Sequence, residues 1–326
     1  MPSKYIGRLV EVGIIKEVTR GTLTPATNGL KKQNVTIQDV AEVAINEMSL
    51  GRIEDANSGL VVKTYAEGEI SGLITDKTIG CLLYNMLGTL SSAAKSAPNA
   101  LAYDHTFTVA NTNVHQALSI EIKDPNSQNG YALAMLETLE IKGEVGGYVE
   151  YSATFKSKSG ATSTATIAYV AENNFIAKHI VVKMASAASG LAVASAIPCK
   201  SFSIKFSQNL EPFFAFGSTA PAEIYNKQLT AEISIVLAND ANTYKAYQLA
   251  GTMMAMLVDI TNTDVTIATS ANPELKFTFN QIVFNEWKIE NGNNDIALET
   301  LTGKMTYKLS ETKAVEAVLS NLTASY

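Results

Sequence analysis

Apolar and polar residues alternate along several segments of the chain. In one of them, Val149, Tyr151, Ala153 and Phe155 are separated by polar residues. Because successive side chains of a strand point to opposite faces of a sheet, this alternation predicts a strand with one buried face. The pattern favours an antiparallel β protein. Three further segments show the same alternation: 118–123, 202–207 and 275–280.

Residues typical of turns punctuate these segments. Asp124-Pro125-Asn126 follows one of them, Gly146-Gly147 precedes another, and a third turn is expected at 291–295. Glycine, proline, asparagine and aspartate favour the backbone angles or the local hydrogen bonds that turns require. Successive strands are therefore expected to be joined by short connections.

Two segments have helical spacing instead. In 76–87, Ile79, Leu83 and Met86 share one helix face, Thr75 or Asp76 is a candidate N-cap, and Gly88 is placed to end the helix. A second helix is predicted in the same way over 239–250, with Asn239 or Asp240 as its cap and Gly251 at its end.

Short identities recur at a nearly constant spacing. Glu69-Ile70-Ser71 is repeated as Glu232-Ile233-Ser234, and Gly88-Thr89 is repeated as Gly251-Thr252, both 163 residues later. Chance similarity between two β-rich halves is the alternative. Because strand, capped helix and Gly-Thr recur in the same order, duplication is the better interpretation. Three weaker matches pair Tyr84 with Tyr247, Gly29-Leu30 with Gly190-Leu191, and Thr154-Phe155-Lys156 with Thr306-Tyr307-Lys308.

The repeat divides the chain into two expected domains, residues 1–157 and 158–326. Each is predicted to be an antiparallel β-sandwich or barrel with one flanking helix. The first half has extra residues after its helix, and the Ala- and Ser-rich segment 90–102 is expected to hold them as a loop.

Composition narrows the possible functions. The chain has 46% hydrophobic and 17% charged residues, an apolar balance that suggests surface buried against other copies. Its net charge of −6 argues against a protein that grips nucleic acid through phosphates. Cys81 and Cys199 are too few for a disulfide framework, and the N-terminus lacks a secretory signal pattern, so we expect folding in a reducing cytoplasm.

No residue pattern indicates catalysis. His105, His115 and His179 have no metal-ligand spacing, and no nucleophile elbow, phosphate-binding loop or dinucleotide fingerprint occurs. Glu67 with Glu69, and Glu140 with Glu144, are spaced as acid–base pairs could be, but acidic residues on one face of a strand are more often a solvated surface. We therefore predict no enzyme, no metal and no cofactor.

The segment 67–84, from Glu67-Gly68-Glu69-Ile70-Ser71 to Leu82-Leu83-Tyr84, resembles the tail tube proteins of long-tailed bacteriophages. The similarity continues in 107–110, 115–120 and 136–156. In the second half it includes Phe216-Gly217-Ser218 and 231–234. The similarity extends over most of the chain and is a similarity in the pattern of residues.

The resemblance implies a structural virion protein that is assembled in the host cytoplasm. In that family a sheet joins neighbouring subunits into a ring, and rings stack into a tube through which DNA passes. The implied partners are further copies of this chain, the tape measure, tail terminator and distal tail proteins, and DNA that passes without specific binding. No membrane insertion is expected. With two domains per chain, three chains would close a ring of pseudo-sixfold symmetry; a hexamer with only one domain in the wall is the alternative.

Two surfaces follow from this interpretation. The first lines the channel with carboxylates that repel DNA, and the second is a segment between the rings. The expected channel residues are Glu67, Glu69, Glu137, Glu140 and Glu232. The expected ring-stacking loop contains Thr24, Asn28, Lys31, Lys32 and Gln33.

Other functions remain open at this point. A tube protein of a contractile or type VI-like injection apparatus would usually have a single domain. A duplicated adhesin or carbohydrate-binding module would also be β-rich and acidic, but it should lack a helix in each repeat.

Overall fold

The computed structural model describes residues 4–239 and 243–326. Strands make up 51% of the chain, which confirms the mainly β fold predicted from the alternating segments. The described residues contain two α-helices, α1 (Ile79–Leu87) and α2 (Thr243–Ala250). Three short 3-10 turns are η1 (Gly7–Leu9), η2 (Ala177–His179) and η3 (Ala188–Gly190).

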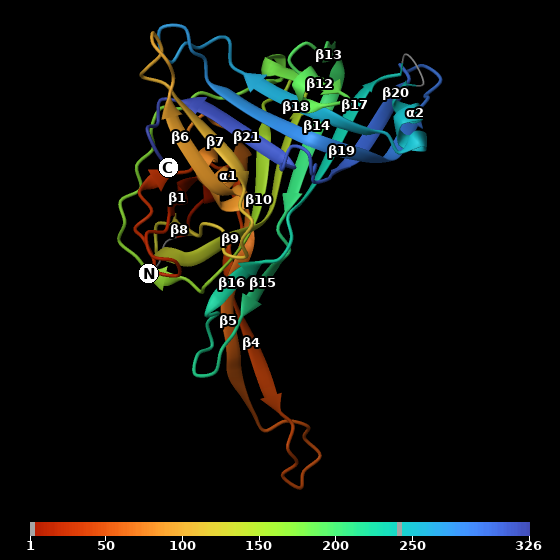
Figure 1. Ribbon diagram of the computed structural model, residues 1–326. Coiled ribbons are helices and arrows are strands. Elements are labelled where there is room, and N and C mark those ends of the chain that lie inside the picture. The colour runs from red at the N-terminus through yellow and green to blue at the C-terminus, as the bar shows by residue number, and fades with distance from the viewer. Residues whose placement is uncertain (1–3, 240–242) are drawn as a thin grey trace.

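One large antiparallel sheet runs through both halves of the chain (Figure 1). Its first strands are β3 (Asn34–Val35), β4 (Gln38–Asn46), β5 (Ser58–Leu73), β6 (Gly88–Ala94), β7 (Tyr103–Val109), β9 (Gln128–Glu144) and β10 (Glu150–Ser157). The others are β12 (Ile180–Ala185), β13 (Ala196–Ile197), β14 (Cys199–Ser207), β17 (Thr230–Ala238), β18 (Met253–Thr261), β19 (Glu274–Glu290), β20 (Leu298–Met305) and β21 (Val315–Asn321).

The central strands of this sheet follow the order β5, β10, β9, β14, β17, β20, β19. The two halves therefore meet where β9 pairs with β14. At its other end, the first part of β19 lies between β18 and β21, and these strands lead to β12 and to β7. Strands of both expected domains thus belong to one sheet.

A smaller antiparallel layer covers the first half. It contains β1 (Glu11–Lys16), β2 (Asn28–Gly29), β8 (Leu118–Lys123), β11 (Ala161–Thr162) and the first part of β9. Helix α1 lies in the same half, and its Ile79, Leu83 and Met86 are buried as their spacing predicted. The core continues into the second half, where the rings of Phe206 and Phe277 are 6.0 Å apart.

The four segments predicted as strands from alternation are all strands, and the three predicted turns connect strands. The helix ends are only partly as expected. Gly88 and Gly251 follow the two helices with positive φ angles of 89° and 60°, which glycine adopts without strain. Helix α1 begins at Ile79, however, because Asp76 instead accepts hydrogen bonds from Asn173. Of the candidate caps of α2, Asp240 lies outside the described residues.

Three other expectations were wrong in detail. The segment 90–102 was expected to be a loop, but β6 extends to Ala94 and pairs with β7. Gly29 lies in β2 whereas Gly190 ends a 3-10 turn, so these glycines do not match. Residues 306–308 follow the end of β20, whereas 154–156 lie within β10. Sequence identity alone placed these matches in the wrong register.

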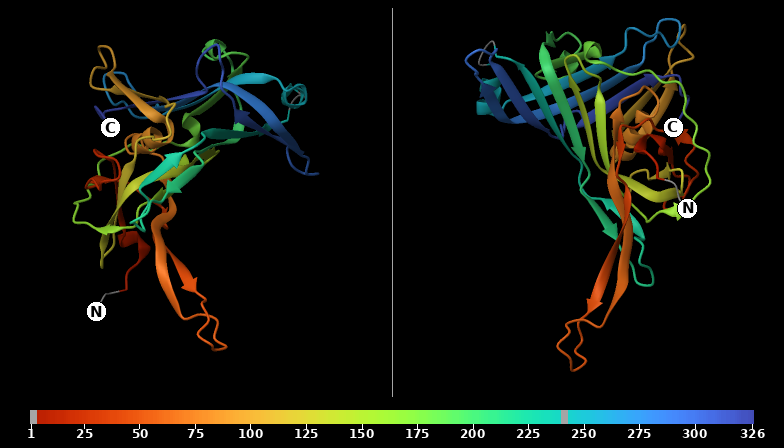
Figure 2. Two further views of the ribbon diagram at one scale, coloured as in Figure 1. Left: turned by 60° about the horizontal axis from the view of Figure 1, so that its bottom comes forward. Right: turned by 180° about the vertical axis from the view of Figure 1, so that it is seen from behind.

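Strands β4 and β5 form a long hairpin that projects from the body of the molecule, which we call the arm (Figures 1 and 2). An ion pair of 2.9 Å between Lys63 Nζ and Glu42 Oε2 joins its strands. Beyond this pair both faces are exposed, although many of the side chains are apolar. The exposed apolar residues are Val43, Ile45, Met48, Leu50, Ile53, Leu60, Val61 and Val62.

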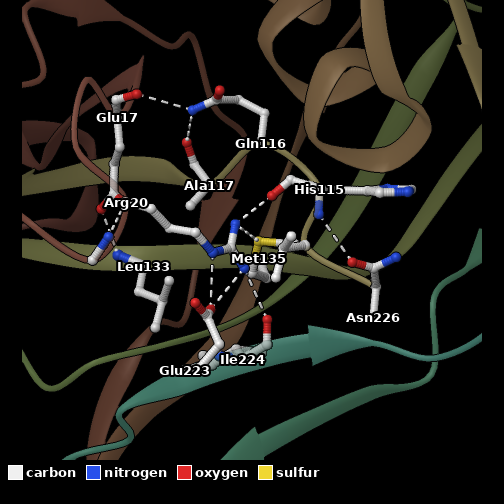
Figure 3. A network of polar contacts seen from close by, with 12 residues as sticks. Glu17, Arg20, His115, Gln116, Ala117, Leu133, Met135, Glu223, Ile224 and Asn226 are labelled. Atoms are coloured by element: carbon white, nitrogen blue, oxygen red, sulfur yellow. Dashed lines mark hydrogen bonds and ion pairs between the residues drawn. The ribbon is translucent and has the colours of Figure 1, made fainter. Parts of the chain in front are cut away.

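A second hairpin, β15 (Leu210–Phe213) with β16 (Glu223–Asn226), is fastened to the first half by a polar network (Figure 3). Arg20 Nε donates to Glu223 Oε1 at 2.9 Å, and its Nη2 donates to the carbonyl of Ile224 at 2.9 Å. Nearby, buried Glu17 accepts a hydrogen bond of 2.6 Å from Leu133 N, and burial raises the pKa of this carboxyl group. The network connects strands that are far apart in the sequence.

Two buried histidines predict how stability depends on pH. Burial lowers the pKa of His105 and of His115, so the unfolded chain binds protons at these rings more readily than the folded protein does. The free energy of unfolding should therefore decrease as the pH falls below the ordinary histidine value of about 6.5. Urea unfolding of unassembled protein should show a smaller decrease for the double variant His105→Asn, His115→Gln. An equal pH dependence in both proteins would contradict this assignment.

Candidate assembly surfaces

The large sheet has a polar face that continues across the junction between the halves. One row of directly opposed residues crosses six strands, and its members alternate in charge from Glu140 onward. Opposite charges in facing cross-strand positions stabilise a sheet by roughly 0.2–1 kcal/mol per pair. The row consists of Ser71, Ser152, Glu140, Lys205, Glu232 and Lys304.

The five glutamates expected to line a channel all lie on this face. Glu67 and Glu69 are on β5, Glu232 is on β17, and Glu140 is on β9. Glu137 joins them because the register of β9 against β10 shifts between Thr154 and Phe155. Its Oε1 is consequently 2.7 Å from the Nζ of Lys156, which is also on the polar face. The bulge could not be read from alternation.

Carboxylates outnumber ammonium groups on this face. Several are paired, as with Lys142 Nζ and Glu150 Oε2 at 3.3 Å, but the balance is negative. The carboxylates are Glu67, Glu69, Glu137, Glu140, Glu144, Glu150, Glu232, Glu286 and Glu290, and the lysines are Lys142, Lys156, Lys205, Lys288 and Lys304.

One edge of β19 is open. Residues 282–290 pair with β20 on one side, while β18 covers the other side only as far as Val283. No strand of the described chain pairs with that side of 284–290. Most of this segment is exposed, and Ile289 retains 36% of its accessible surface. In β9, the segment 138–142 is covered on both sides by β10 and β14, β14 continues to 144, and Ile141 is fully buried.

The other end of the sheet is open as well. Asn34 and Val35 pair with β5, as does β4, but within the described residues no strand covers their outer side. Val35 and Ile37 are only half-buried. Unpaired edges expose rows of N–H and C=O groups to which another strand can add. The central row of strands, from β5 to β19, therefore has an open edge at each end.

The predicted ring-stacking loop is a packed segment rather than a projecting one. Asn28 pairs with Ile14, and the Thr24 N–H donates to Ser119 Oγ at 2.9 Å. The Lys31 Nζ is 3.4 Å from Glu172 Oε2, and Lys32 donates to the carbonyl of Gly7. Gln33 bonds to Ser71 through its backbone. Part of the segment is therefore strand, and its role in stacking stays a prediction.

Other kinds of site have little support. Among residues 4–239 and 243–326, no group of three or more histidine, cysteine or acidic side chains could hold a metal ion. The helices of this same part of the chain are too short or too polar to cross a bilayer. Burial raises the pKa of the Cys81 thiol to about 12 and that of Cys199 to about 11, so neither is a ready nucleophile.

A β protein with an open edge at each end of its central row of strands and with a continuous polar face is suited to pairing with further copies of itself. The comparison with known families agrees: residues 7–308 match the model of the phage tail tube proteins. The chain belongs to this family, whose members assemble with themselves and are structural rather than enzymatic components of the virion tail. No curated protein matches the chain significantly.

Hydrogen exchange should distinguish the open edge from its covered counterpart. In unassembled protein, amides of 285–290 should exchange faster than those of 139–144 by at least about tenfold, equivalent to roughly 1.4 kcal/mol of local stability. Both segments end long strands and both precede turns, so the second is a matched control. Equal protection in mass-spectrometric exchange would show that something else covers the β19 edge.

Proposed function

We propose that this protein forms the tail tube of a long-tailed phage. Chains close into rings by sheet pairing, and stacked rings leave a channel for viral DNA. The observation that carries the proposal is the pair of open edges at opposite ends of the central row of strands. A closed ring supplies both of these edges with a partner strand.

Each half of the chain is one tube domain, and the two arose by duplication. Their order of strand pairing supports this. Strand β1 pairs with β2 and β8, as β12 pairs with β13 and β18. Strand β10 lies between β5 and β9, as β20 lies between β17 and β19. Helix α1 follows β5, as α2 follows β17.

Residue registers support the same conclusion. In the first half, Ser71 lies opposite Ser152, which lies opposite Glu140. In the second half, Ser234 lies opposite Thr302, which lies opposite Glu286. This correspondence, made by strand pairing alone, aligns Glu140-Ile141-Lys142-Gly143-Glu144 with Glu286-Trp287-Lys288-Ile289-Glu290. Three of the five residues are identical.

Three chains make one ring. Ring closure determines how many domains fit around the channel, whichever number of chains supplies them. Since the β9–β14 pairing already joins two domains within the chain, three copies give six domains with pseudo-sixfold symmetry. The first half differs from the second by the β6–β7 hairpin after its helix.

The polar face lines the channel, with Glu67, Glu69, Glu137, Glu140 and Glu232 on it. Its negative balance repels phosphates, so DNA slides without being bound. The opposite face of the sheet carries the apolar core and therefore points outward, toward α1 and the smaller layer. DNA leaves the virion through this channel during ejection.

The arm connects successive rings. Its apolar residues are exposed on both faces, and such a surface gains stability when it is buried against the next ring, by roughly 25 cal/mol per Å². At the ends of the tube, the same surfaces meet the tape measure, terminator and distal tail proteins. Assembly takes place in the host cytoplasm.

Electron microscopy tests the function and the role of the arm together. The wild-type protein should form tubes. In a shortened variant, Asn-Gly replaces residues 44–60, so that a two-residue turn joins the paired Val43 and Val61. Both open edges of the sheet lie outside the deletion, so this variant should form isolated rings.

The outcomes separate two claims. Tubes formed by the shortened variant would reject stacking through the arm while leaving the tube function intact. A wild-type protein that forms neither rings nor tubes would contradict the proposed function itself. The variant Glu54→Gln, which changes an exposed polar residue of the arm without shortening it, is the matched control and should form tubes as the wild type does.

A further inference from the structure

The junction between the halves shows how two tube domains join. Strands β9 and β14 pair antiparallel from Thr138 opposite Ser207 to Glu144 opposite Ser201. On the core side, Ile141 lies opposite Ile204 and both are fully buried. Beyond the ladder, Val145 N donates to the carbonyl of Lys200 at 3.0 Å.

We infer that the junction between chains repeats this pairing, so that 286–290 of one chain pairs antiparallel with 32–36 of the next and Lys288 lies opposite Asn34. This inference rests on the proposed ring and specifies which residues close it. The partner is a second copy of the chain.

Strand pairing within the chain determines this register. Lys142 of β9 lies opposite Ser203 of β14. Lys288 is the counterpart of Lys142 in the alignment of β9 with β19. Ser203 lies opposite Ser234, and the repeated Glu-Ile-Ser motif makes Ser71 the counterpart of Ser234. Since Asn34 lies opposite Ser71, Asn34 is the counterpart of Ser203.

A groove lies where the neighbouring strand would end. It has a volume of about 740 Å³ beside 31–35, and Arg8, Val10 and Tyr169 also line it. The corresponding place in the internal junction, beside 199–202, holds only about 50 Å³ of empty space. There the chain segment 143–145 lies between β14 and the residues around η2. Its counterpart, 289–291 of a neighbour, fits the open groove.

Charge and polarity also match in this register. Glu290 lies opposite Lys32, with Lys31 and Arg8 nearby on the groove. On the core side, Trp287 lies opposite Val35, as Ile141 lies opposite Ile204. The Trp287 ring is held by its Nε1 bond to Glu299 at 2.7 Å and by Lys245 above the ring, so the strand is already ordered for pairing.

Cysteine pairs test the register in assembled tubes. Facing Cβ atoms in an antiparallel pair are about 5 Å apart, close to the separation of a disulfide. The double variant Asn34→Cys, Lys288→Cys should therefore form covalent dimers and trimers after mild oxidation, seen on denaturing gels without reductant. In the control Gln38→Cys, Lys288→Cys, the second position is shifted by four residues, or roughly 13 Å, and should stay monomeric.

Variants that carry only one of the new cysteines show whether the native Cys81 or Cys199 takes part in the cross-links. Tubes that link equally well through the control pair, or through neither pair, would overturn the register but not the tube function.

A measurement on wild-type tubes does not depend on the variants folding. Carbodiimide should join Lys32 of one chain to Glu290 of the next, and mass spectrometry should find that peptide pair in tubes but not in unassembled protein. If tubes form and the pair is absent, the inference is wrong; if no rings form, the proposed function has failed.

Discussion

Backbone hydrogen bonding at strand edges is the constraint on which this structure depends. Every second residue of an open antiparallel edge has its N–H and C=O groups without a protein partner, and such an edge is either covered, distorted or paired. Within the chain, β14 covers the second half of β9. No strand of the described chain does the same for the second half of β19. The difference between these two strands leaves the β19 edge available for pairing with a strand of another chain.

Other features follow from extending one sheet through both halves. The core is continuous, since Phe206 of β14 packs against Phe277 and Phe279 of β19. The opposite face of the sheet is free to be polar throughout, so glutamates and lysines from successive strands form paired rows. The Arg20 network holds the β15–β16 hairpin against the first half, so the chain connecting β14 to β17 is anchored (Figure 3).

The sequence predicted those elements in which one face is buried and the other is not. In strands such as β10, buried and partly exposed residues alternate one by one, so the alternation of apolar and polar residues predicted these strands. The arm was missed because its side chains are exposed on both faces and apolar residues occur on each, which leaves no period of two. The position of Glu137 depends on a bulge, and bulges break alternation. The start of α1 was misplaced because a distant residue, Asn173, takes Asp76 away from its expected capping role.

The sequence predicted that the protein assembles with itself, but not which surfaces are used for assembly. Resemblance to tail tube proteins indicated a self-assembling protein, and 7–308 matches that family. Which strand edges are open depends on pairing between residues far apart in the sequence, and no local pattern encodes it. The segment 24–33 was predicted to be a ring-stacking loop because of its polar and Gly-containing composition, and this role stays a prediction. In the structure, Ala26 and Leu30 of this segment are buried.

The central claim is that two equivalent domains lie in each chain and that both contribute to the wall of the ring. Counting the chains in end-on averages of isolated rings by electron microscopy tests it most directly. The account predicts three chains and six similar wall segments per ring. Six chains per ring, with only one of the two Glu-Ile-Ser strands facing the channel, would contradict it.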